Sequence, residues 1–489
     1  MPTLHPQRRG IGVRGAQALA LAAGLLPGVA TPPSAAAGKA TLTLLPTAVE
    51  VRSPFTSDGR LEILVPNYLA DEGVAVGDAF DLQRDHEYEV GWYWSPAKGL
   101  RVVDPTNGRK RWVSDPRNEK RLRSTCQYAF ETTAYCVDDV GDVLYAYSDA
   151  RGFQILDRGD PEALEVLRRA FSEEGLPRPA PIQVVWKAAN GRGNGGLLAA
   201  ATGVEPEPSQ RHPVGLIHSP EHGWQVMSRL DPRLDGGQEV INDPQVFNRR
   251  GDSLFNQGHA GGRQDVFLLD GRTGEITLLG IGPEYNNVLC GTLSESRSGC
   301  GFSYAGTGYS DPRERTYVSW LFDPERGVRV LDLPDHLSAY HLLPDGDLLV
   351  SGQVGRSLLT WYRYSPGRSR LTRLISEKRY ARFFPPGTRD ISRSGHEITR
   401  DGDLLLFLSG TFRGRSITRF LHYFLESNRL LDVRDLIGDA EVVDLDRPGS
   451  RPVARRRIEF LDFVNMNSRG ESLWFVLVDG RPRAAILSP

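Results

Sequence analysis

The sequence lacks the features that mark most membrane-spanning, nucleotide-binding and hydrolytic proteins. After residue 40 the apolar runs are short, as at residues 403–408, so no transmembrane helix is expected. The nucleophile elbow Gly-x-Ser-x-Gly, the phosphate loop and the metal motif His-Glu-x-x-His are absent. No catalytic residue, metal site or cofactor is therefore predicted, and the function has to be sought elsewhere.

An excess of charge of either sign is also missing. The 59 Lys and Arg residues and 61 Asp and Glu residues give a net charge of −2, which argues against nucleic-acid binding. Arg8, Arg9 and Arg14 precede an apolar run at residues 18–30 and an Ala-x-Ala site. We therefore predict a signal peptide over residues 1–37, cleaved after Ala37 or alternatively Ala30, and an exported, extracellular or periplasmic chain.

Cysteine is scarce, and its four positions form two evenly spaced pairs. Cys126 and Cys136 enclose nine residues, as do Cys290 and Cys300. In an exported chain this local spacing predicts the disulfides Cys126–Cys136 and Cys290–Cys300. Metal binding is the alternative, although it usually involves shorter Cys-x-x-Cys spacings.

What the sequence has in abundance is turns, with 52 glycines and 33 prolines. One turn pattern recurs: a glycine, then an acidic residue, then two or more apolar residues. Glycine supplies the positive φ of tight hairpin turns. The copies are "FNRRGDSLF" (247–255), "LLPDGDLLV" (342–350), "ITRDGDLLLF" (398–407) and "MNSRGESLWF" (466–475), with "VAVGDAF" (74–80) as a degenerate copy.

The tripeptide Arg250-Gly251-Asp252, which many adhesion ligands present, belongs to this repeat. Its counterpart in the last copy is Arg469-Gly470-Glu471, which could not serve as an adhesion signal. We therefore interpret residues 250–252 as a hairpin turn.

A second hairpin pattern follows each such turn and consists of two apolar, aromatic-rich segments around a short turn. Its eight turns fall near residues 95, 149, 219, 270, 323, 365, 426 and 479. Units of two hairpins, repeated eight times, predict an all-β fold with one β-propeller over residues 38–489. Eight four-stranded blades are favoured over seven. A stack of β-sandwiches and two smaller propellers are the alternatives.

Two segments interrupt the strand pattern. "DPEALEVLRRAFSEEG" (160–175) predicts a short helical insertion, with Asp160 as the N-cap and Gly175 at the end. His212, His218 and His222 form the one histidine cluster, but turn histidines are commoner than metal ligands, and no metal is predicted there.

The closing stretch "VNMNSRGESLWFVLVDGRPRAAILSP" resembles the bacterial extracellular repeat proteins named for a His-Ala-Phe (HAF) tripeptide. Asn467, Gly470, Leu487 and Pro489 match the repeat, whereas Arg483-Ala484-Ala485 stands in place of the tripeptide. The resemblance implies a secreted, propeller-like repeat protein and implies no particular chemistry.

The best candidate for a binding surface is the basic and aromatic segment "SEKRYARFFPPGTRD" (376–390). Arginine can hold carboxylate or sulfate groups through two hydrogen bonds, and aromatic faces stack on sugar rings. We predict that Arg379, Tyr380 and Arg382 point outward to a ligand while Phe383 and Phe384 anchor the segment below. An inter-blade connector without ligand is the alternative.

The function predicted from these features is a monomeric, non-catalytic binding module for a protein or polysaccharide. A polysaccharide lyase on the same scaffold is the alternative. Such a lyase needs a Tyr or His base beside an arginine that neutralises the substrate carboxylate, and Tyr380 with Arg379 or Arg382 would supply those groups.

Overall fold

A computed structural model describes the chain from residue 40 to residue 489, apart from several internal segments. The segments outside the description are residues 51–59, 62, 81–87, 104–121, 131, 139–142, 157–164, 167, 170–181, 186–196, 204–212, 220–222, 227–241, 249, 259–263, 280–286, 305–316, 335, 353–359 and 447–457. The predicted signal peptide lies outside the described residues.

The described strands form eight antiparallel units of four strands, which we number as blades along the chain; a short parallel pairing of residues 88–89 with residues 122–123 joins blades 1 and 2. Blade 1 consists of β4 (Ile63–Leu69), β5 (Ala75–Phe80), β6 (Tyr88–Ser95) and β7 (Gly99–Val103). Blade 2 consists of β8 (Leu122–Phe130), β9 (Thr133–Asp138), β10 (Val143–Ser148) and β11 (Gly152–Leu156). Blade 3 consists of β12 (Ile182–Val185), β13 (Leu197–Gly203), β14 (Pro213–Ser219) and β15 (Gly223–Val226). Blade 4 consists of β16 (Asn242–Phe247), β17 (Ser253–Gly258), β18 (Gln264–Leu269) and β19 (Ile276–Leu278).

The second half of the chain repeats the arrangement. Blade 5 consists of β20 (Asn287–Leu293), β21 (Gly299–Tyr304), β22 (Tyr317–Asp323) and β23 (Gly327–Val330). Blade 6 consists of β24 (Leu337–Leu342), β25 (Leu348–Gly352), β26 (Thr360–Ser365) and β27 (Arg370–Ile375). Blade 7 consists of β28 (Arg389–Ile398), β29 (Leu404–Phe412), β30 (Arg415–Phe424) and β31 (Arg429–Asp432). Blade 8 consists of β33 (Ile458–Met466), β34 (Ser472–Val478), β35 (Arg481–Ser488) and the early strand β1 (Thr41–Leu44).

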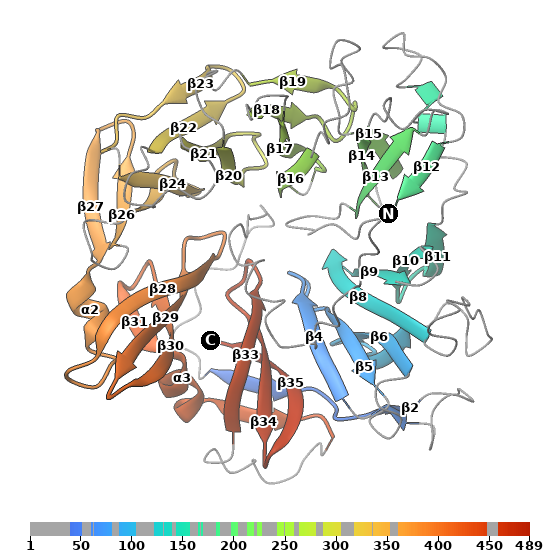
Figure 1. Ribbon diagram of the computed structural model, residues 1–489, viewed down its shortest axis with the longest axis vertical. Coiled ribbons are helices and arrows are strands. Elements are labelled where there is room, and N and C mark those ends of the chain that lie inside the picture. Colours follow the sequence, from blue (N-terminus) through green and yellow to red (C-terminus); the bar gives the residue numbers. More distant parts are fainter. Residues whose placement is uncertain are drawn as a thin grey trace, which may run out of the picture.

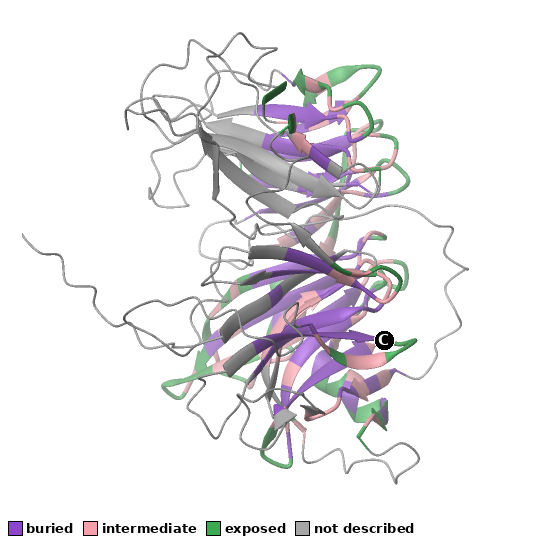
Figure 2. Cartoon of the chain, turned by 90° about the vertical axis from the view of Figure 1, so that its right-hand side faces the viewer, coloured by how far each residue is buried: buried purple, intermediate pink, exposed green. Residues whose placement is uncertain are grey.

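The eight sheets are arranged in a ring, which confirms the predicted eight-bladed β-propeller (Figure 1). Strands β4, β16, β20 and β24 lie toward the centre, and β19, β23 and β27 lie at the outer edge. The hydrophobic core is divided among the contacts between neighbouring blades. Trp92, Trp320, Trp361 and Trp474 are its largest fully buried side chains. Figure 2 shows that buried residues fill the strands and that exposed residues gather at the turns.

The first hairpin turn has the same backbone geometry in six blades. In each, the first residue of the turn donates to the carbonyl of the fifth, and the fourth donates to the carbonyl of the first. The fourth residue has a positive φ; it is glycine in five turns and Arg297 in the sixth. The turns span residues 70–74, 248–252, 294–298, 343–347, 399–403 and 467–471. Four are the predicted copies, which are thereby confirmed.

The degenerate copy predicted at residues 74–80 is wrong. The turn of blade 1 is formed by residues 70–74 with Gly73 at a φ of 78°, whereas Gly77 lies inside β5. A Cβ atom on Gly77 would come within 1.9 Å of the Val65 carbonyl oxygen and 2.7 Å of the Trp92 ring. Gly77 is therefore required for close packing rather than for a turn.

The acidic residue of the blade 4 turn is buried, which supports the turn interpretation of residues 250–252. The side chain of Asp252 is 1% exposed. Its carboxylate accepts hydrogen bonds from Asn248 Nδ2 at 2.9 Å, from the Gly271 backbone N–H at 3.0 Å and from Arg297 Nη2 at 3.0 Å. Because Arg297 belongs to blade 5, this carboxylate connects two blades and cannot meet an adhesion receptor.

The last blade is completed by the beginning of the described chain. Strand β1 pairs antiparallel with β35 and parallel with β32 (Glu441–Asp444). Arg483, which is 5% exposed, donates to the Leu45 carbonyl at 2.6 Å and to Asp444 at 2.8 Å. The hairpin near residue 479 therefore connects the second and third strands of its blade, β34 and β35, whereas the predicted pattern made it the hairpin of the third and fourth strands. Strand β1 takes the remaining place.

Short elements outside the blades are few in the described chain. Helix α2 (Glu377–Ala381) connects blades 6 and 7, and helix α3 (Val433–Asp439) follows blade 7, with Asp432 as its N-cap. β2 (Val49–Glu50) pairs with β3 (Arg60–Leu61). Residues 165, 166, 168 and 169 of the predicted insertion are helical, and the rest of that insertion is not described. Among the described residues, no helix has the length and apolar character needed to cross a bilayer.

Only one of the two predicted disulfides is present. Cys126 and Cys136 are direct partners across β8 and β9 and form the predicted disulfide. The predicted Cys290–Cys300 disulfide is wrong, because Cys300 is a free, buried cysteine. Strand pairing sets Cys290 opposite Gly301 and Cys300 opposite Thr292, with a bulge between residues 290 and 292. This register is one residue away from the one that a cross-strand disulfide requires.

We expect non-reducing peptide mapping of the oxidised protein to recover a single linked pair, Cys126–Cys136. Burial raises the pKa of the Cys300 thiol to about 12, so Cys300 should react with an alkylating reagent only after unfolding. Quantitative alkylation before and after denaturation measures this directly. Recovery of a peptide that links Cys290 to Cys300 would contradict the strand register.

Candidate functional site

Arg379 is engaged inside the protein rather than presented to a ligand. Its guanidinium donates to the Leu374 carbonyl and to Asn428 Oδ1, both at 2.7 Å, and to the Asn428 carbonyl at 2.9 Å. It also lies 5.5 Å from the centre of the Tyr423 ring. Arg379 therefore holds helix α2 against the β30–β31 turn of blade 7.

The outward orientation predicted for Tyr380 is also wrong. Tyr380 is 1% exposed and packs in the core between blades 6 and 7, with Trp361 and Leu404. Burial raises its pKa above the usual value for a tyrosine. A buried phenol with a raised pKa is unsuited to remove a proton from a polysaccharide, so Tyr380 does not support the lyase alternative.

Phe383 and Phe384 pack against the same core, as predicted. The Phe383 carbonyl accepts a hydrogen bond from Arg419 Nε at 2.8 Å, and the Arg419 guanidinium lies 5.9 Å from the Phe384 ring centre. Residues 376–388 thus form a well-packed connector. Of the three predicted ligand-binding residues, Arg382 alone is exposed.

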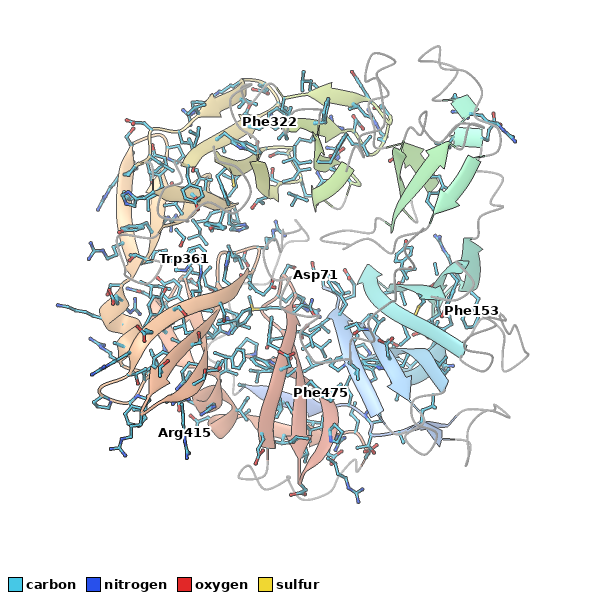
Figure 3. The ribbon with its side chains drawn as sticks, viewed as in Figure 1. Asp71, Phe153, Phe322, Trp361, Arg415 and Phe475 are labelled. Atoms are coloured by element: carbon cyan, nitrogen blue, oxygen red, sulfur yellow. A yellow bond between two sulfur atoms is a disulfide. The ribbon has the colours of Figure 1, made fainter. Side chains whose placement is uncertain are left out.

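Arg382 is one of four exposed arginines on blade 7 and the connector before it, which we call the arginine face: Arg382, Arg389, Arg413 and Arg415. Arg389 pairs with Thr411 and Arg415 with Phe412, so both lie at the end of the sheet that carries the β29–β30 hairpin, on opposite sides of it. Phe384, two residues after Arg382, has a ring atom 3.3 Å from where a Gly410 Cβ would stand, so the connector runs along β29 toward this end. Arg415 projects outward from blade 7 (Figure 3).

The arginine face has no internal counter-charge within the described structure. None of its four side chains forms an ion pair with a described carboxylate, although Asp390 follows Arg389 directly. The Arg413 guanidinium lies over the Phe412 ring, 5.1 Å from its centre. Four exposed guanidinium groups without partners create a positive potential that favours an anionic ligand.

No local sequence motif marks this surface, but the distribution of charge along the chain does indicate it. Residues 360–432, which run from β26 to β31, contain 14 Lys and Arg and 7 Asp and Glu, a net charge of +7. The whole chain carries −2. Strong positive charge on two neighbouring blades of a nearly neutral protein marks a potential binding surface.

Metal binding has no support among the described residues, which contain no group of three or more His, Cys, Asp or Glu side chains placed to hold an ion. The cluster considered from the sequence, His212, His218 and His222, lies outside the described side chains.

The buried His341 joins three blades. Its Nδ1 lies 2.8 Å from Thr292 Oγ1, and its Nε2 lies 2.9 Å from the Arg400 carbonyl oxygen.

The fold defines the class of this protein as an eight-bladed β-propeller. No protein-family model matches the chain, and no curated protein matches it significantly. The resemblance to the HAF-type repeat proteins thus stays a prediction.

Solved structures resemble the chain at low identity. TolB from Acinetobacter baumannii is 12% identical over 78% of this chain and 83% of its own, with a TM-score of 0.31. An oligogalacturonate lyase in complex with manganese is 11% identical over 92% and 98%, with a TM-score of 0.38. A prolyl endopeptidase is 10% identical over 84% of this chain, which spans about half (53%) of that protein, with a TM-score of 0.42. Likeness at this level carries no argument about activity.

Proposed function

We propose that this protein is an exported β-propeller that binds an anionic polysaccharide through the arginine face of blade 7. The observation that carries the proposal is the set of four exposed arginines without a described carboxylate partner. The predicted signal peptide and the Cys126–Cys136 disulfide support export. Regularly spaced carboxylates or sulfates on a polysaccharide suit several guanidinium groups at once.

A polysaccharide is favoured over a protein ligand because of the aromatic rings near the arginines. Phe412 lies beneath Arg413, and Phe383 lies one residue from Arg382; both are partly exposed. Flat aromatic faces pack on sugar rings, while the guanidinium groups bind the acidic substituents. An acidic protein ligand would depend on the same arginines and is an alternative outcome of the test.

Replacing all four arginines of the face with alanine is expected to weaken binding to polygalacturonate about tenfold or more, since each exposed charge contributes roughly 0.2–1 kcal/mol. Binding of the wild type should weaken with salt, because the screening length falls from about 10 Å at 0.1 M to about 3 Å at 1 M. Biolayer interferometry with immobilised polygalacturonate and neutral dextran measures both effects.

A matched control removes four exposed arginines elsewhere: Arg272, Arg326, Arg329 and Arg481. The control variant has the same net charge as the test variant, so it should bind nearly as the wild type does. Equal losses in the two variants would show that overall charge, and not the arginine face, determines binding. An unchanged affinity in the test variant, or equal binding to dextran, would refute the proposal.

A further inference from the structure

Another arginine of blade 7, Arg393, lies apart from the arginine face, between blades 6 and 7. The guanidinium of Arg393, on β28, is 5.1 Å from the centre of the Trp361 ring and 5.8 Å from that of Tyr340. Its Nη1 donates to Ser351 Oγ at 3.3 Å. The His396 ring is 5.0 Å from the Tyr340 ring and 5.1 Å from the Trp361 ring. We call these five residues the Arg393 cluster, and Figure 3 shows Trp361 at the boundary between the two blades.

The positive charge of Arg393 is not balanced from within the described structure. No described carboxylate forms an ion pair with it, and the groups that interact with its charge are the phenols of Tyr340 and Tyr380. Burial accordingly lowers its pKa from the usual value for arginine. Placing a cation among aromatic rings without a counter-ion is costly, so such an arrangement is uncommon unless a ligand supplies the anion.

The cluster also contains more hydrogen-bond donors than acceptors. A guanidinium has five N–H donors, and Ser351 Oγ and the Tyr340 hydroxyl are the described acceptors that Arg393 reaches. The Trp361 Nε1–H is buried without a partner. The His396 ring forms no hydrogen bond with a described residue, and burial, followed by the charge of Arg393, lowers its pKa well below 6.5. A site with surplus donors is complementary to a ligand rich in oxygen acceptors.

A ligand can reach the cluster from one side. Ser351, Trp361 and His396 are buried, whereas Arg393 and Tyr340 are partly exposed. The cluster thus has a partly exposed edge at Arg393 and Tyr340 and an aromatic interior.

The position of Arg393 relates the cluster to the arginine face. Arg393 pairs with Leu408 and Arg415, a member of that face, with Phe412, so both side chains project from the same side of the sheet, separated by four residues or about 13 Å of β29. A chain of sugars bound along the arginine face can therefore deliver one of its acidic units to Arg393.

We propose that Arg393 and Tyr340 bind the carboxylate and ring of a single uronic acid unit, with Ser351, Trp361 and His396 holding the two side chains in place. The proposal rests on the proposed function, because it names the unit of the anionic polysaccharide that is recognised. Arg393 supplies two parallel N–H donors for the carboxylate, and the partly exposed Tyr340 ring offers a face for the sugar. The site determines specificity for carboxylated over neutral sugars.

The test uses a monosaccharide, which is too small to span the arginine face. Free galacturonate should bind the wild-type protein, and neutral galactose should not, as measured by isothermal titration calorimetry. Arg393→Met should weaken galacturonate binding at least about tenfold, because the variant loses charge-assisted hydrogen bonds to the carboxylate. Arg393→Lys keeps the positive charge but cannot donate two parallel hydrogen bonds to a carboxylate, so an intermediate affinity is expected.

Thermal unfolding separates this role from a structural one. Arg393→Met should melt at or above the wild-type temperature, because the aliphatic side chain still covers Trp361 while the unbalanced charge is removed. A much lower melting temperature together with unchanged galacturonate binding would identify Arg393 as a structural residue and overturn the proposal. Equal binding of galactose and galacturonate would overturn it too.

The two proposals fail in distinguishable ways. Arg413→Ala with Arg415→Ala should weaken polygalacturonate binding and leave galacturonate binding within about twofold. If the polymer binds through the arginine face but the monosaccharide does not bind at all, the Arg393 site is refuted alone. If the wild type binds neither, the proposed function is refuted together with it.

Discussion

Replacing Leu42 and Leu44 with alanine is expected to open the ring at blade 8 and to cause one of the largest losses of stability of any double substitution. Both side chains are fully buried in the core shared by blades 7 and 8 and helix α3. Truncation of a buried leucine costs about 2–5 kcal/mol, so the pair should lower the free energy of unfolding by several kcal/mol. Urea denaturation followed by tryptophan fluorescence measures the change.

The same strand provides its own control. Thr41 and Thr43 alternate with the leucines and are only partly buried, so replacing both with alanine should cost about 1 kcal/mol or less. If the threonine variant loses as much stability as the leucine variant, burial of the two leucine side chains is not the main contribution of β1. If neither variant differs from the wild type, β1 does not close the ring in solution.

Acidification from pH 6.5 to pH 4 should destabilise the protein through its buried histidines. Burial lowers the pKa of His341 and of His422 to about 4, compared with 6.5 in the unfolded chain. Between these values the unfolded state binds protons that the folded state does not, so the free energy of unfolding falls as the pH falls and stops falling below pH 4. Each histidine should lower the free energy of unfolding by on the order of 3 kcal/mol over this range.

His422 allows this effect to be isolated. Its Nε2 has no partner in the described structure, and its ring stacks 4.2 Å from that of Phe424. His422→Phe should therefore fold well, and its stability should fall between pH 6.5 and pH 4 by roughly 3 kcal/mol less than that of the wild type. Denaturant titrations at the two pH values provide the comparison.

Asp403 provides a control, because its pKa is shifted in the direction that makes acid stabilise the folded state. Burial raises its pKa to about 6, so in the folded state it binds a proton more readily than in the unfolded chain, and its contribution to stability grows as the pH falls through 6. Asp403→Asn should consequently make the protein more sensitive to acid.

Equal acid sensitivity in the wild type and in His422→Phe would contradict a neutral, buried His422.

Much of the fold could be predicted because its turns are local. The hydrogen bonds of the turn at residues 248–252 join groups at most four residues apart, so a short motif with a glycine is sufficient to specify it. Arg297 shows the limit of this reasoning. It adopts a φ of 66° without glycine, because its side chain forms ion pairs with Asp252 and Asp270 of the neighbouring blade.

The candidate site could be predicted only in part. Residues 376–390 combine basic and aromatic residues, which correctly indicates charge near blade 7, but no local pattern separates the exposed Arg382 from the bonded Arg379. That distinction depends on Asn428, which is 49 residues away along the chain. The Arg393 cluster cannot be predicted from a local pattern, because the aromatic neighbours of Arg393, Tyr340 and Trp361, come from another blade.

Residues close together in the chain specify the eight repeated units, most of their hairpin turns and the Cys126–Cys136 disulfide, so these could be predicted. Only contacts between residues far apart in the chain place β1 in blade 8, bring the Asp252 carboxylate into an inter-blade ion pair and leave Cys300 free. These outcomes depend on strand register and on contacts between blades. A one-residue change of register moves a side chain to the other face of its sheet without any visible change in local sequence pattern.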